Sequence, residues 1–209
     1  MSGFRFPPAL INSYHALAIL AGLAFLISAV APVQVGGLRT YGAFLGTPFF
    51  LGVTALLIGV LGLHVGGAER HWEGEVPGAA RHRVVRLTGL LTVGWALLTP
   101  FVVASRLLQG GSWPGLGLAA LFLLVCGWWW AAAGLAVAGR LESGGTQFLV
   151  KYGGLAFVYF APLVLAIPVS PIVILSRLWD GPDAVGLGGI ALYGGLDLVV
   201  VVLWLARKS

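Results

Sequence analysis

The chain has 209 residues, of which 59% are hydrophobic and only 9% are charged, whereas about 25% of residues are charged in an ordinary soluble domain. This composition is typical of a polytopic membrane protein and leaves no stretch for a soluble domain, so residues 1–209 are expected to form one transmembrane domain in a lipid bilayer. The formal net charge of +5 comes from basic residues in the connections between apolar stretches. It therefore indicates membrane topology and argues against nucleic acid as a partner.

Six apolar stretches are each long enough to cross a membrane, which takes roughly 20 residues in a helix. We therefore expect an all-α integral membrane protein, a bundle of six transmembrane helices. The fifth span contains Pro162, Pro168 and Pro171, which are expected to kink it. The most polar connection is the loop 66–84, and the spans are expected at about 10–33, 41–65, 85–108, 116–138, 148–178 and 186–206.

The basic residues divide unevenly between the two sides of this topology. One side has Arg39, Arg106 and Arg177, and the other has many more: Arg5, Arg70, Arg81, Arg83, Arg86, Arg140, Lys151, Arg207 and Lys208. Because cytoplasmic loops carry an excess of Lys and Arg, we expect both termini and the loop 66–84 to be cytoplasmic. The expected location is a cell membrane, of the prokaryotic inner-membrane or plasma-membrane type.

A weak internal pattern links the ends of the odd-numbered spans, where a proline precedes Arg39, Arg106 or Arg177. Its recurrence about every 70 residues favours three helical hairpins of similar length. The alternative is that any six-span chain of this size repeats a hairpin at this interval, with an arginine anchoring each interface. If the hairpins are a repeat, Asp197 is equivalent to Gly59 and Cys126.

Asp197 is the single carboxylate inside the apolar stretch 186–206, and Tyr193 lies one helical turn away on the same face. A carboxylate near the middle of a membrane costs on the order of 3 kcal/mol to insert, so such residues face protein or water and have a partner. One interpretation is a proton or cation site. The other is a buried Asp that holds helices together by a hydrogen bond.

His15 and His64 lie near the same end of the first two spans, so a short turn would bring their imidazoles to a similar depth. Such a pair predicts ligation of a b-type haem. The alternative is that both histidines lie at the membrane interface with their polar tips in water.

The loop 66–84 contains His71, Glu73, Glu75 and His82, but their spacing matches no standard zinc site. Contact with a partner protein or with anionic lipid is the expected role of this loop. The sequence also has no phosphate-binding glycine loop followed by lysine, no HExxH and no serine-nucleophile elbow. These absences argue against an ATPase or a hydrolase and leave no complete catalytic site within the chain.

Two functions follow from these patterns. The first is an integral membrane subunit of a larger energy-converting complex of the electron-transfer or respiratory type, either structural or holding a haem or quinone. The chain would then be an enzyme only as part of a membrane oxidoreductase, docked to other membrane subunits through its glycine-rich helices. The second is a small proton- or cation-linked transporter or channel, alone or within a multi-subunit transporter, that uses Asp197.

Overall fold

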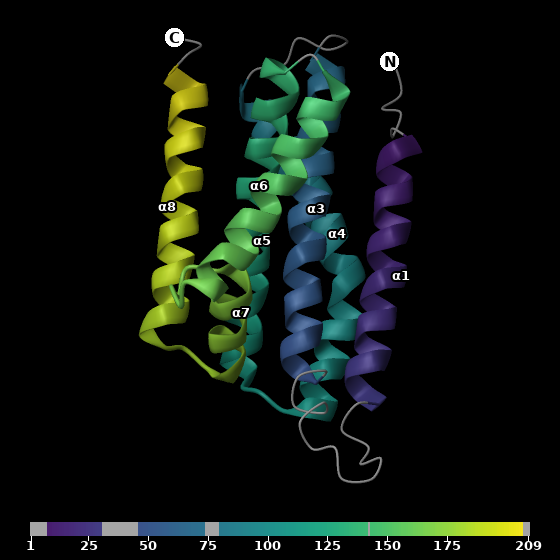
Figure 1. Cartoon of the computed structure of the whole chain (residues 1–209), viewed down its shortest axis with the longest axis vertical. Coiled ribbons are helices and arrows are strands. Elements are labelled where there is room, and N and C mark those ends of the chain that lie inside the picture. The colour runs from purple at the N-terminus through teal and green to yellow at the C-terminus, as the bar shows by residue number, and fades with distance from the viewer. Residues whose placement is uncertain (1–7, 31–45, 74–79, 142, 207–209) are drawn as a thin grey trace.

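The computed structural model describes residues 8–30, 46–73, 80–141 and 143–206, which form helices joined by short connections (Figure 1). The described helices are α1 (Pro8–Val30), α3 (Thr47–Glu73), α4 (Ala80–Gln109), α5 (Trp113–Arg140), α6 (Gly144–Val164), α7 (Pro171–Asp180) and α8 (Ala184–Ala206).

The prediction of an all-α, multi-pass membrane protein is confirmed. Within the described residues, six helices are long and apolar enough to cross a membrane, and α7 is the short additional one. Helix α1 begins, and α8 ends, at the same end of the bundle (Figure 1). We call this the terminal end and the other the opposite end; the cytoplasmic location of the terminal end stays a prediction.

The fifth span differs from the continuous, kinked helix expected over 148–178. Helix α6 ends at Val164 and a separate helix, α7, begins at Pro171. Between them Ala166 has a positive φ of 56°, and Pro168 has no N–H to continue a helix. The Ser170 side chain then accepts a hydrogen bond from the N–H of Ile172, so Ser170 and Pro171 form a standard helix start.

The polar connection is shorter than the predicted loop 66–84. Helix α3 continues to Glu73 and α4 already begins at Ala80, and residues 31–33, 41–45 and 74–79 lie outside the described part of the chain. The reason is packing: Gly66 lies inside the interface between α3 and α5, where a Cβ atom would come within 1.9 Å of the Ala131 carbonyl oxygen. This glycine lets two backbones approach closely and does not end the helix.

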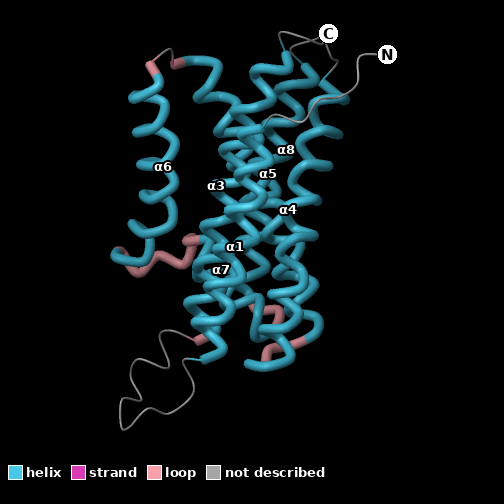
Figure 2. The backbone as a smooth tube through the Cα atoms, turned by 90° about the vertical axis from the view of Figure 1, so that its right-hand side faces the viewer, coloured by secondary structure: helices cyan, strands magenta, loops and turns pink. Residues whose placement is uncertain are grey.

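The centre of the molecule is the contact between α3 and α5, built from small residues. A Cβ atom on Gly62 would meet the Gly127 carbonyl oxygen at 2.5 Å, and one on Gly134 would meet the Leu63 carbonyl oxygen at 2.4 Å. Helices α1 and α4 pack against this pair, and α8 packs on α5. Helix α6 stands apart from the rest in Figure 2, whereas α7 returns to the bundle and packs against α3, α5 and α8.

Candidate functional site

A group of polar side chains lies in the interior between α3, α5, α6 and α8. Its centre is Tyr159 on α6, whose side chain is completely buried. The Tyr159 hydroxyl donates to the Ala55 carbonyl oxygen of α3 at 2.8 Å and lies 3.4 Å from the Cys126 sulfur of α5. The Ser170 hydroxyl, just before α7, donates to the Tyr159 carbonyl oxygen at 2.7 Å. Tyr159 therefore joins four segments of the fold.

Asp197 lies on α8, which packs against α5. Its side chain is half-buried, and its Oδ1 atom is buried without a hydrogen-bond partner among the described residues. An unsatisfied carboxylate oxygen in a membrane interior is energetically costly. This part of the chain therefore has an open hydrogen-bonding position that a proton, a cation or a donor from outside could fill.

Tyr193, one turn from Asp197 on α8, is buried, and its hydroxyl bonds away from Asp197. It donates to the Val169 carbonyl oxygen at 3.4 Å, and its ring packs edge-on against Phe122 with the centroids 5.7 Å apart. Tyr193 thus attaches α8 to the irregular segment between α6 and α7. Its hydroxyl therefore makes no hydrogen bond to the Oδ1 atom of Asp197.

The three positions that the hairpin pattern makes equivalent, Gly59, Cys126 and Asp197, lie around one centre. A Cβ atom on Gly59 would lie 2.9 Å from the Tyr159 hydroxyl oxygen, and the Cys126 sulfur lies 3.4 Å from it. Asp197 follows Tyr193 by one turn of α8, as Cys126 follows Phe122 by one turn of α5, and the Tyr193 and Phe122 rings are in contact. This convergence fits three hairpins whose second helices, α3, α5 and α8, all run toward the terminal end. Whether the hairpins are a true repeat stays a prediction.

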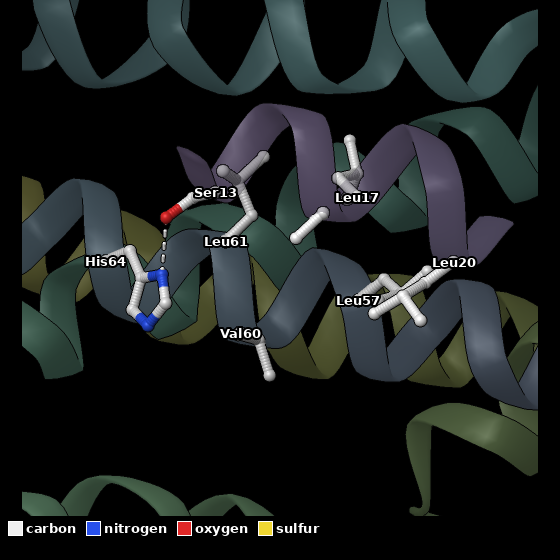
Figure 3. Close-up of a pocket in the computed structure, with 8 residues that line it drawn as sticks. Ser13, Leu17, Leu20, Leu57, Val60, Leu61 and His64 are labelled. Atoms are coloured by element: carbon white, nitrogen blue, oxygen red, sulfur yellow. Dashed lines mark hydrogen bonds between the residues drawn. The ribbon is translucent and has the colours of Figure 1, made fainter. Parts of the chain in front are cut away.

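A second polar group lies nearer the terminal end, around His64 (Figure 3). The Nδ1 atom of His64 is 2.7 Å from the Ser13 hydroxyl of α1. Its Nε2 atom is 2.5 Å from the Tyr152 hydroxyl of α6. From His64 toward the opposite end, apolar side chains of α1 and α3 line a small open cavity of about 70 Å³. His64 thus links three helices.

His15 does not join His64. Its side chain is exposed on α1, whereas Ser13 is the α1 residue that reaches the His64 ring. Both ring nitrogens of His64 already have hydrogen-bond partners in the protein, and a haem ligand must offer a free nitrogen lone pair to iron. The bis-histidine haem site stays a prediction to which this geometry adds no support.

The last turns of α3, which the sequence assigned to the loop 66–84, contain a buried carboxylate that the sequence did not single out. Glu69 of α3 is completely buried and accepts hydrogen bonds from both Nε and Nη2 of Arg86 on α4, with Arg83 at 4.0 Å. The Arg83 guanidinium also lies over the Trp204 ring of α8, 5.1 Å from its centroid. The ion pair thus joins α3 to α4 at the terminal end, and the contact between Arg83 and Trp204 joins α4 to α8.

Of the four residues considered for a metal in the connection, His82 is the one whose side chain the structure describes. His82 is exposed on α4, the side chains of His71 and Glu73 lie outside the described residues, and so does Glu75. Within the described residues no three His, Cys, Asp or Glu side chains gather in a way that could hold a metal ion.

Sequence reasoning missed Tyr159 and Lys151. The topology prediction counts Lys151 among the loop charges, but Lys151 lies within α6. Its ammonium is 3.2 Å from the position that a Cβ atom would take on Gly67 of α3. A lysine inside an apolar helix was the available signal.

Comparisons with known proteins found no matching family model, no matching curated protein and no matching solved structure.

Proposed function

We propose that this chain is an integral membrane subunit of a larger complex and that its partner covers the break between α6 and α7. The observation that carries the proposal is an exposed segment at membrane depth that belongs to no helix. Residues 165–169 lie outside any helix and are all exposed in the isolated chain, with Leu165 at 65% and Ile167 at 44%.

The depth of this break follows from helix lengths. Helix α5 has 28 residues, which is roughly 42 Å, and α7 has 10 residues, which is roughly 15 Å. The Ser112 N–H, just before α5, donates to the Trp179 carbonyl oxygen at 3.1 Å, so the end of α7 is level with the start of α5. The break therefore lies roughly 15 Å inside the opposite end, within a hydrocarbon layer about 30 Å thick.

Lipid chains offer no hydrogen bonds, so irregular backbone occurs at this depth only where protein or a water-filled cavity covers it. The side chains at the break are apolar and bulky, among them Leu165, Ile167 and Val169. Such a surface suits a packed transmembrane helix better than a water-filled cavity. A partner subunit that brings apolar side chains and a few donors meets both requirements.

The narrower assignment, to an energy-converting complex of the electron-transfer type, rests on the sequence: compact connections, glycine-rich helices and no complete catalytic motif within the chain. It requires partner subunits that carry redox groups. Purification of the complex from its native membrane in a mild detergent, followed by mass spectrometry and a dithionite-reduced minus oxidised spectrum, tests it. Partners without redox groups would refute the electron-transfer assignment and leave the subunit proposal standing.

Docking at the break is tested with a matched pair of variants. Leu165→Trp adds bulk at the break, and Leu198→Trp adds the same bulk to the lipid-facing side of α8, where Leu198 is 64% exposed. We expect Leu165→Trp to lower the yield of the complex in native electrophoresis, while Leu198→Trp leaves it unchanged. A wild-type chain that migrates as a monomer under mild extraction would overturn the proposal.

Asp197 supports a second candidate, a proton- or cation-linked transporter. The specific observation is the buried Oδ1 atom without a partner, on a helix that packs beside the broken span; broken helices near the membrane middle recur at transporter binding sites. In proteoliposomes Asp197→Asn should abolish ion-dependent flux, whereas Asp197→Glu should retain part of it. If Asp197→Asn protein transports ions as the wild type does, this candidate fails.

A further inference from the structure

We propose that the groove between α1, α3 and α6 binds an anionic phospholipid, with an acyl chain along α3 and the phosphate beside Lys151. The proposal is independent of the two candidate functions above. It rests on an apolar channel, a cation that has no counter-charge among the described residues, and a fixed polar group between them.

The apolar part of the groove is the cavity of about 70 Å³ between α1 and α3. Leu17 and Leu20 line it from α1, and Leu57 and Val60 from α3, so that all of its wall except Ser13 and His64 is apolar. Figure 3 shows these side chains following one another along the two helices. A narrow, open, elongated apolar surface suits one hydrocarbon chain and is far smaller than the roughly 300–1,000 Å³ of a drug-sized ligand site.

The cation lies at one end of this surface. Along α3 toward the terminal end, Val60 is followed by His64 and then by Gly67, against which the Lys151 ammonium packs. Each step is about one helical turn on the same face. The order is therefore apolar channel, polar group and positive charge toward the membrane surface, which is the order of tail, glycerol ester and phosphate in a phospholipid.

Lys151 has no acidic partner among the described residues. The nearby carboxylate of that end, Glu69, is fully buried and already paired with Arg86 and Arg83. Lys151 itself is half-buried. A half-buried ammonium without a counter-charge favours an anion brought from outside, and phosphate oxygens are strong acceptors for it.

The polar group between the two parts can supply a second donor. When His64 carries its proton on Nε2, the ring donates to the Tyr152 oxygen, and the Tyr152 hydroxyl proton is then available to a phosphate or ester oxygen. Tyr152 and Lys151 are adjacent in α6, and both reach α3. The hydrogen bonds from His64 to Ser13 and Tyr152 also hold α1, α3 and α6 at a fixed separation around the groove.

The test uses the full-length protein in detergent, titrated with phosphatidylglycerol or phosphatidylcholine and observed by native mass spectrometry. We expect one phosphatidylglycerol to bind tightly and phosphatidylcholine to bind about tenfold more weakly. Lys151→Gln should remove this preference, and Lys151→Arg should keep most of it. The matched control is Arg140→Gln, which removes an exposed charge on α5, also at the terminal end. It should leave the preference for phosphatidylglycerol unchanged.

A second variant separates a lipid from a free anion. Val60→Trp fills the apolar channel without touching Lys151, so it should weaken phosphatidylglycerol binding while leaving any binding of inorganic phosphate unchanged. Equal binding of both lipids, displacement of the lipid by inorganic phosphate alone, or a quinone found in place of the lipid would each overturn the proposal. Variants that elute from size exclusion like the wild type are the ones compared, and Lys151→Arg preserves the comparison if Lys151→Gln does not fold.

Discussion

The two sides of α3 contact their neighbouring helices in different ways. Toward α5 it presents small residues, and the spans formed by α3 and α5 are 61% and 56% buried within the chain. Toward α6 it presents Ala55, Gly59, His64 and Gly67, and the span formed by α6 is only 11% buried. One side is held by close backbone packing along its whole length, and the other by a few polar contacts.

We call the tightly packed pair α3 and α5 the scaffold, and α6, which a few polar contacts hold to it, the attached helix. In a membrane, association is driven by packing and by interhelical hydrogen bonds, since lipid is as apolar as leucine. The α3–α5 contact has the packing. Helix α6 depends on the bonds from Tyr159 to Ala55 and from Tyr152 to His64, so its remaining surface is open to lipid and to partners. Both the proposed partner site and the proposed lipid site lie on this side.

The largest effect is expected where the scaffold is tightest. Gly66→Leu would place a side chain where even a Cβ atom meets the Ala131 carbonyl oxygen at 1.9 Å, and a backbone carbonyl has no rotamer with which to move aside. Destabilisation of about 3 kcal/mol or more is expected, at the upper end of overpacking effects. Unfolding in mixed micelles would measure it. Gly89→Leu is the control, because nothing lies within 4 Å of a Cβ atom there.

The next effect concerns the ion pair that closes the scaffold at the terminal end. Glu69→Gln keeps the shape of the side chain but removes the charge that pairs with Arg86, which is itself 22% exposed. Because water partly solvates Arg86, we expect a loss of about 2 kcal/mol, not the full cost of an isolated buried charge. The same unfolding assay measures it, with Arg140→Gln as the exposed-charge control. No change in stability would mean that the pair is dispensable.

A smaller effect should appear on the attached side and sharpen the contrast. Tyr159→Phe removes the hydrogen bond to the Ala55 carbonyl oxygen, at a cost of about 1 kcal/mol. We expect faster hydrogen–deuterium exchange in α6 while α3 and α5 remain protected. Tyr193→Phe, which loses only the longer 3.4 Å contact with Val169, is the control for α6. Uniform loosening of all helices would show that α6 and the scaffold open as one unit.

The spans were predictable from the sequence because a membrane imposes a length of roughly 20 apolar residues on each helix. The break at residues 165–170 was not, since most of its residues are as apolar as those of a helix, and the three prolines of the span, Pro162, Pro168 and Pro171, are equally consistent with kinks. Gly66 was misread for a related reason. In a soluble chain glycine ends helices, whereas here it allows close contact with Ala131, and only the position of a helix far away in sequence decides between the two.

The polar residues show the same limit. Asp197 was found because a carboxylate in an apolar stretch stands out against its neighbours. Tyr159 does not stand out, because its importance depends on Ala55, 104 positions away in the sequence. Lys151 was counted with loop charges because the start of α6 is rich in glycine and polar residues. Local pattern identifies unusual residue types, and tertiary packing decides which ordinary ones become central.

The smallest expected effect distinguishes the two histidines. His15→Ala changes an exposed side chain on α1, so stability should change by less than about 0.5 kcal/mol and the exchange of α6 should not change. His64→Ala removes both ring contacts, to Ser13 and Tyr152, and should accelerate exchange at the terminal end of α6. A haem held by the pair requires both residues equally, because each would supply one axial ligand. If His15→Ala instead removes a Soret band from the purified protein, His15 must face the interior of the protein. The orientation of α1 in this structure, with His15 exposed, would then be wrong.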